Sequence, residues 1–262
     1  MSDEPSSEYI LKYDIDSLEL LYKQLNKPRF IHPDPLECIL KFEDVREREI
    51  AGVIAASLAY GRVTQIISNI YHVLNVMGDS PLEFVMSNTE SRIKKKFKSF
   101  KYRFTTGDDL ASFLAGVGRA VREYGTLENC FVQHFDPADE TVIPALCGFV
   151  GSISGTEKCC YLTPTPDRGS ACKRMNLFLR WMVRRDEVDP GGWESVPASK
   201  LVVPLDIHMH RISKKLGITT RNQADLKTAL EITAAFKKIQ PGDPVKYDFA
   251  LSRTGILKLP SI

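Results

Sequence analysis

The strongest helical signal in the chain lies at residues 171–185, which read ACKRMNLFLRWMVRR. Apolar residues recur there at the spacing of a helical face, with basic residues interspersed. Similar patterns lie on both sides of this segment, at residues 10–25, 46–58, 63–76, 108–124, 126–134, 207–216, 224–239 and 245–254, with shorter helix starts at 34–40 and 80–83. Strand-like alternation is confined to residues 200–205, which are too few to count. The sequence therefore predicts an all-α fold.

Composition narrows the class of protein. Apolar residues make up 43% of the chain and charged residues 26%, a balance that favours a globular protein over a disordered one. No run approaches the ~20 apolar residues that a membrane helix needs. The first residues, MSDEPSSEY, do not resemble a signal peptide. We therefore expect a cytoplasmic protein without membrane contact. The net charge of +2 is small, so a nucleic-acid partner has to be argued from local patches.

The cysteines give no indication of a metal or cofactor. None of the six forms a C-x-x-C pair with zinc-ligand or redox spacing: Cys38, Cys130, Cys147, Cys159, Cys160 and Cys172. Because no cysteine follows Cys172 in the sequence, we expect no C-terminal iron–sulfur cluster on four cysteines. We interpret all six as reduced thiols and expect neither a metal nor a cofactor.

Lys173 is the first candidate for chemistry. It is expected in the first turn of its helix, where the positive end of the helix dipole disfavours a second positive charge. This placement favours the neutral amine that nucleophilic lysine chemistry requires. The alternative is a surface lysine whose stem covers Met175 or Leu177.

Asp206 is the second candidate. Residues 202–211 read VVPLDIHMHR, so an apolar extended segment ends and a helix begins at Asp206. An aspartate at this position is typical of an N-cap. A carboxylate held by backbone amides stays ionised, so a cap and a fixed catalytic charge are compatible interpretations. His208 and His210 are two residues apart and point away from each other on a helix, which argues against a metal pair.

Lys173 and the segment around Asp206 together resemble a motif of a known enzyme family. Lys173 on a helix, followed across a loop by the segment PLDIHM at 204–209, resembles the lysine and the V-P-x-D-x-H segment of bifunctional helix-hairpin-helix DNA glycosylases. The interval from Lys173 to Asp206 is similar to that of the archaeal 8-oxoguanine glycosylase branch. The whole chain also resembles an uncharacterised bacterial domain-of-unknown-function family, DUF2400, over residues 51–85, 97–135 and 170–255.

The resemblance implies a single glycosylase-like unit over residues 1–262, with lobes at 45–150 and at 1–44 plus 151–262 around a cleft. It implies a monomer that acts on damaged duplex DNA. Lys173 would attack the sugar of an oxidised purine nucleotide, Asp206 would stabilise the resulting charge, and a Schiff base would permit AP-lyase cleavage. The residues expected to form the base pocket are Trp181, Tyr247, Asp248 and Phe249.

The expected DNA contacts come from two regions. The glycosylase hairpin normally contains an apolar-Gly-x-Gly turn, whereas residues 165–170 read TPDRGS and keep only Gly169. Arg168, Gly169 and Arg174 would hold a phosphate there, although Asp167 adds a negative charge. The second region, residues 94–103, interleaves cations and aromatics, and Lys95, Lys96 and Lys98 would contact phosphates. The alternative for this run is a solvated helix end.

Two other functions fit the sequence. One is a non-catalytic nucleic-acid-binding protein on the same fold. The other is a helical scaffold protein in which Lys173 and Asp206 form a buried ion pair.

Overall fold

The computed structural model describes residues 15–155 and 161–256, and the described chain is mostly helical. Its α-helices are α1 (Ile15–Leu25), α2 (Val45–Ser57), α3 (Val63–Met77), α4 (Pro81–Ser87), α5 (Glu90–Lys96), α6 (Gly107–Tyr124), α7 (Leu127–Val132), α8 (Ile143–Ile153), α9 (Lys173–Val183), α10 (Ile207–Lys215), α11 (Leu226–Ile239) and α12 (Asp248–Ile256). Two-residue strands β1 (Lys101–Tyr102) and β2 (Thr105–Thr106) pair antiparallel. The predicted all-α class is confirmed.

Local capping explains where many helices begin. The side chains of Asp44, Ser80 and Asp225 accept backbone N–H bonds at the starts of α2, α4 and α11. Thr106 and Asp109 form a reciprocal capping box at the start of α6. Such caps satisfy amides that the helix itself leaves free, so they fix the first turn.

The structure differs from the sequence prediction in several places. Residues 34–40 contain a short 3₁₀ helix, Pro35–Cys38, rather than an α-helix. Helices α5 and α8 and the small hairpin are not among the predicted elements. The predicted helix at 10–25 begins at Ile15 in the structure, and residues 10–14 lie outside the described ranges.

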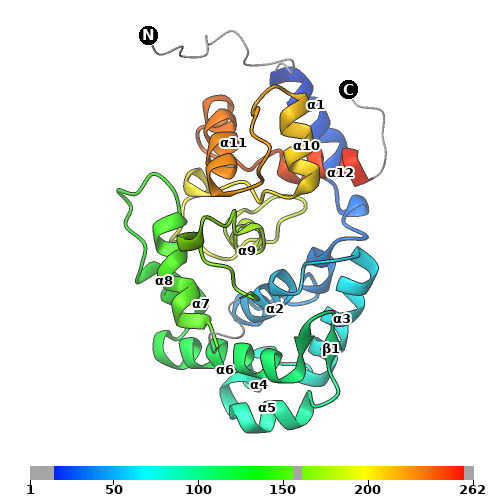
Figure 1. The fold of residues 1–262 in the computed structure, drawn as a ribbon, viewed down its shortest axis with the longest axis vertical. Helices are drawn as coiled ribbons and strands as arrows, with labels where there is room; N and C mark the ends of the chain where they lie inside the picture. The colour runs from blue at the N-terminus through cyan, green and yellow to red at the C-terminus, as the bar shows by residue number, and fades with distance from the viewer. Residues whose placement is uncertain (1–14, 156–160, 257–262) are drawn as a thin grey trace.

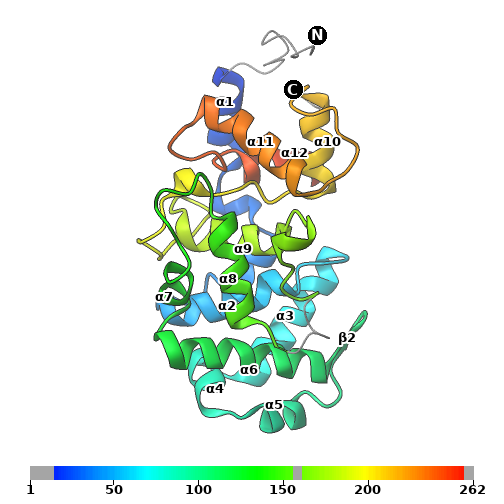
Figure 2. The ribbon, with the colours of Figure 1, turned by 60° about the vertical axis from the view of Figure 1, so that its left-hand side comes forward.

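The helices are arranged along one long axis (Figures 1 and 2). Helices α1, α10, α11 and α12 gather at one end, and α3 to α6 lie at the other. Helix α9 lies between the ends and packs on α2. The lobe boundaries at 45 and 150 stay a prediction. Within the described ranges, no helix combines the length and the apolar character needed to cross a membrane.

Buried ion pairs fix α9 relative to the C-terminal part of the chain. Arg180 contacts Asp189 and Asp248, and Arg184 contacts Asp189 and Asp243. Both arginine side chains are only 4% exposed. Removing one partner from such a network leaves an uncompensated buried charge, which is strongly destabilising. The network therefore holds the start of α12 against α9.

Candidate active site

A cavity of about 720 Å³ opens where the N-termini of α9 and α10 approach each other. Its wall also includes the segment after α2, at Tyr60 and Gly61, and part of α12. A cavity of this volume lies within the range of ligand sites in proteins. Lys173 and Asp206 both line it.

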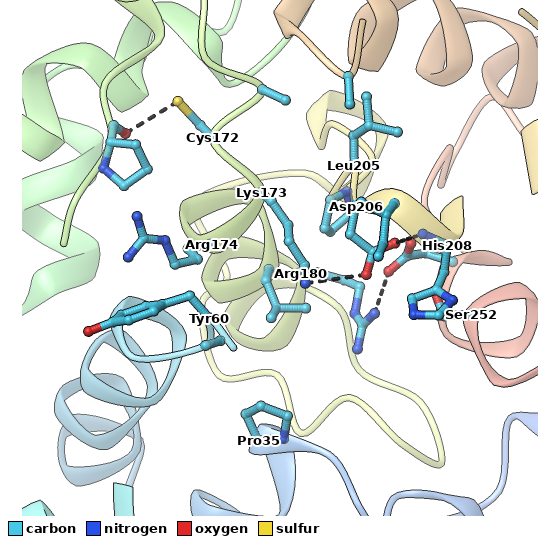
Figure 3. A pocket seen from close by; sticks show the side chains of 18 of the residues that line it. Pro35, Tyr60, Cys172, Lys173, Arg174, Arg180, Leu205, Asp206, His208 and Ser252 are labelled. Carbon is cyan, nitrogen blue, oxygen red and sulfur yellow. Dashed lines mark hydrogen bonds and ion pairs between the residues drawn. The ribbon is translucent and has the colours of Figure 1, made fainter. Parts of the chain in front are cut away.

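Lys173 extends from α9 toward Asp206 (Figure 3). The Nζ of Lys173 lies 3.2 Å from the Oδ2 of Asp206, and their side chains are 37% and 22% exposed. The two predicted residues therefore face each other at the cavity. Both side chains remain partly exposed, so the pair differs from the buried ion pair named in the scaffold alternative.

The two oxygens of Asp206 have different partners. Oδ1 accepts backbone N–H bonds from His208 at 2.9 Å and Met209 at 2.8 Å, so Asp206 is the N-cap of α10. Oδ2 is the oxygen that faces Lys173. The predicted cap is confirmed, and it directs the second oxygen at the lysine.

The loop before α9 brings to the cavity two of the residues expected to hold a DNA phosphate. Arg168 and Gly169 line it, and Gly169 has a left-handed backbone with φ of +74°. Asp167 is turned away, because its carboxylate accepts hydrogen bonds from Cys147 at 3.1 Å and Thr165 at 3.0 Å. These bonds hold the pKa of Asp167 below its ordinary value. The carboxylate is thus satisfied by protein donors.

Helix α9 begins without a side-chain cap at Cys172, which itself has a left-handed φ of +48°. The Sγ of Cys172 donates to the carbonyl oxygen of Pro164. Free amides at a helix start favour an anion, and here they adjoin the lysine that lines the cavity.

Arg174 lines the cavity together with Arg168 and Gly169, but its guanidinium is bound by other parts of the protein. Its guanidinium donates to the carbonyl oxygens of Ser57 and Tyr161 and lies over the ring of Tyr60, with 5.3 Å to the centroid. Burial lowers the pKa of Arg174. Figure 3 shows it on a different side of α9 from Lys173. Arg174 therefore ties α9 to α2 rather than presenting a free cation to a phosphate.

The four residues expected to contact a base separate into two groups. Asp248 and Phe249 line the cavity. Trp181 and Tyr247 are 0% and 1% exposed, and neither is part of its wall. The hydroxyl of Tyr247 donates to Glu19 at 2.6 Å. The structure thus places these two large aromatics in the core, where burial of a large ring stabilises the fold.

Asp248 has an unusual environment for a cavity residue. Burial raises its pKa to about 6, against the opposing effect of Arg180. Among the described residues, none forms a hydrogen bond with Oδ1 of Asp248, although this atom is buried. A buried oxygen without a partner is costly, which sets Asp248 apart among the residues that line the cavity.

Comparison with known proteins identifies the family. Over residues 34–257, the chain matches the family described as a protein of unknown function, DUF2400. The chain belongs to this family. The matched region includes Lys173, Asp206 and Asp248, and therefore the polar groups that meet at the cavity. No curated protein and no solved structure matches this DUF2400 chain.

The basic segment of this DUF2400 protein lies at the end of the molecule opposite α10. Lys95 and Lys98 line a second, open groove with Lys94 and Lys101. The ammonium of Lys96 lies instead over the ring of Phe84, with 5.7 Å to the centroid. The neighbouring aromatics Phe97, Phe100 and Tyr102 are buried, so they do not stack on a base.

Sequence reasoning missed the residues that shape the cavity rim. Tyr60 follows the last turn of α2 and stacks on Phe104 of the small hairpin. No local pattern identifies this contact, because it joins residues that are distant in the chain. Within the described part of the chain, no group of three or more His, Cys, Asp or Glu side chains could hold a metal ion.

Proposed function

We propose that this protein is a DNA base-excision glycosylase that acts on an oxidised purine through Lys173 and Asp206 and also cleaves the strand. The observation that carries the proposal is the 3.2 Å contact between Nζ of Lys173 and Oδ2 of Asp206 at the wall of the cavity. A nucleophile beside a fixed negative charge is the arrangement that substitution at a sugar C1′ needs.

The volume and the lining of the cavity support the proposal that it binds a nucleotide turned out of the duplex. A glycosidic bond inside a duplex is out of reach, so the damaged nucleotide must be turned out into a pocket. The volume of about 720 Å³ lies in the range of ligand sites. Phe249 and Asp248 line the cavity, where they would lie against the base.

The proposed reaction begins with the neutral amine of Lys173. Its lone pair forms the bond to C1′, and the glycosidic bond breaks with its electron pair leaving on the base, which takes up a proton. The amine then loses a proton as the C1′–O4′ bond opens, which gives a Schiff base and a protonated O4′. Loss of a C2′ proton expels the 3′ phosphate by β-elimination and cuts the strand.

Asp206 serves this reaction in two ways. Its carboxylate is 3.2 Å from the Lys173 ammonium and can accept a proton from it before attack. Asp206 then passes this proton to the departing base, which restores its negative charge and lets it stabilise the positive charge on the sugar. The amides of His208 and Met209 hold the carboxylate in place for both roles.

Borohydride trapping tests the proposal. A Schiff base between the protein and DNA is reduced to a stable amine, so protein and oligonucleotide stay linked under denaturing conditions. The assay uses a panel of duplexes, each with one modified base, beginning with an oxidised purine. Lys173→Gln is compared with Lys215→Gln, which changes an exposed lysine in the last turn of α10.

Wild type and Lys215→Gln should form the adduct, and Lys173→Gln should not. Adduct formation by Lys173→Gln would exclude Lys173 as the nucleophile. If wild type forms no adduct with any duplex but still binds DNA with strong salt dependence, the chain is a non-catalytic nucleic-acid-binding protein. Absence of both would favour the scaffold alternative.

A further inference from the structure

An aromatic ring is exposed at the tip of the hairpin between β1 and β2. Phe104 is 59% exposed, although a phenylalanine gains stability when its ring leaves water. The neighbouring residue Arg103 has a left-handed φ of +54°, a conformation that is uncommon for a residue other than glycine. The hairpin thus holds an apolar ring in solvent on a constrained turn.

The ring is held in a fixed orientation. Phe104 stacks on Tyr60 with ring centroids 5.1 Å apart and planes at 12°. Tyr161 contacts it at 4.9 Å with planes at 75°. Tyr60 therefore covers one face of the Phe104 ring, while the side chain as a whole remains exposed. An aromatic ring that is held by neighbouring rings and still mostly exposed is suited to stacking on another flat ring.

Several contacts fasten the hairpin to the cavity rim. The hydroxyl of Tyr102 donates to the carbonyl oxygen of Tyr60, and the hydroxyls of Tyr60 and Thr105 lie 2.5 Å apart. The main chain approaches closely at Gly61, where an added Cβ would lie 2.8 Å from the Tyr102 hydroxyl oxygen. Gly61 also has a φ of +104°, so both the space and the backbone require glycine.

The same contacts connect Phe104 to the candidate active site. Tyr60 and Gly61 line the cavity that contains Lys173 and Asp206. On its other side, Tyr60 is linked to α9 through the guanidinium of Arg174. Phe104 thus packs directly on Tyr60, which is a residue of the cavity wall.

The charge around the hairpin selects the class of ligand. The exposed cations Arg62, Lys101 and Arg103 lie within three residues of Tyr60 or Phe104 in the chain. The nearby carboxylate of Asp109 accepts bonds from Thr106 in the capping box. A flat ring flanked by cations suits a ligand that combines a planar base with negative phosphates, which is a nucleic-acid strand.

We propose that Phe104 stacks on an unpaired nucleobase beside the cavity and that Arg103 and Lys101 hold the adjoining phosphates. This inference rests on the proposed function, because it assigns a second contact to the same DNA. Stacking requires a base whose face is free, so Phe104 favours DNA with an unpaired base over fully paired duplex.

Equilibrium binding separates stacking from electrostatic attraction. The ligands are a fluorescein-labelled 20-nucleotide duplex with one central tetrahydrofuran residue, which leaves the opposite base unpaired, and the same duplex fully paired. Phe104→Ala is compared with Phe104→Trp, which restores a stacking ring. Met86→Ala is the matched control, because Met86 is an exposed apolar residue on α4. Dissociation constants are measured by anisotropy at several salt concentrations.

Phe104→Ala should bind the tetrahydrofuran duplex roughly 5- to 150-fold more weakly, the range for loss of one stacked base. The loss should be similar at every salt concentration, because stacking releases no counterions. Phe104→Trp should restore binding, and Met86→Ala should bind like wild type. Unchanged binding by Phe104→Ala, or an equal loss on fully paired duplex, would overturn the inference.

Trapping of the same variants distinguishes this inference from the proposed function. If wild type is trapped while Phe104→Ala binds normally, the stacking role is wrong and the glycosylase proposal stands. If wild type is never trapped while Phe104→Ala loses binding, the stacking role stands and the catalytic proposal is wrong.

Discussion

Replacement of Asp206 separates its structural role from its proposed chemical role. The two carboxylate oxygens have separate partners, since Oδ1 caps α10 through two amides and Oδ2 faces Lys173 at 3.2 Å. Asp206→Asn retains an oxygen for the cap, because asparagine caps about as well as aspartate. Asp206→Ala removes the cap and should cost about 1 kcal/mol of unfolding free energy. For a chain of this size, that corresponds to a lower Tm by roughly 2–4 °C.

The chemical consequence should be the same in both variants. Neither asparagine nor alanine supplies a negative charge or accepts a proton from Lys173. Loss of one such stabilising group lowers the rate of the chemical step on the order of 10²–10³-fold. Single-turnover base release on an oxidised-purine duplex measures this rate, and thermal unfolding measures stability. Full activity in Asp206→Asn would remove Asp206 from the mechanism, and a Tm as low as that of Asp206→Ala would refute the assignment of the cap.

Three further predictions concern other parts of the molecule. Lys95→Ala and Lys98→Ala should each lower the slope of log K against log salt by about 0.9 on duplex DNA. Lys96→Ala should leave the slope unchanged, because the Lys96 ammonium lies over an aromatic ring. If all three variants keep the wild-type slope, the groove makes no phosphate contact. Burial raises the pKa of Glu49 to about 7, so the folded chain binds this proton more tightly than the unfolded chain. Its contribution to stability is therefore present at acidic pH and lost as pH rises through 7. Denaturant unfolding at pH 5 and pH 8 should show a smaller drop for Glu49→Gln than for wild type, and equal drops would contradict this. Trp181→Ala should cost ~3–5 kcal/mol of unfolding free energy, because the side chain is fully buried; a loss below ~1 kcal/mol would contradict its place in the core.

The residues that sequence analysis located well are those whose signals are local. The cap at Asp206 follows from the order of an extended segment, an aspartate and a helix, and the structure confirms it. That Lys173 and Asp206 face each other is expected only from the family resemblance, because no local rule brings together residues 33 positions apart. The all-α class follows from periodicity, which is the most reliable sequence signal for long helices.

The features that sequence analysis missed depend on tertiary contacts. Helix α8 is apolar on most sides and begins with a proline in its first turn, so it lacks the polar face that marks a surface helix. Trp181 is expected at the pocket from the glycosylase resemblance, yet the packing of α9 places it in the core. The exposure of Phe104 depends on a hairpin with two-residue strands, which are too short to produce a periodic pattern.

Mapping the trapped adduct by mass spectrometry tests the central claim most directly. After borohydride reduction with an oxidised-purine duplex, the protein and DNA are digested, and the peptide that carries the reduced sugar remnant is sequenced. The proposed mechanism predicts the modification on Nζ of Lys173, the amine that faces Asp206 across 3.2 Å. A modification on another lysine, such as those of the groove at residues 94–101, or no modified peptide at all, would contradict it.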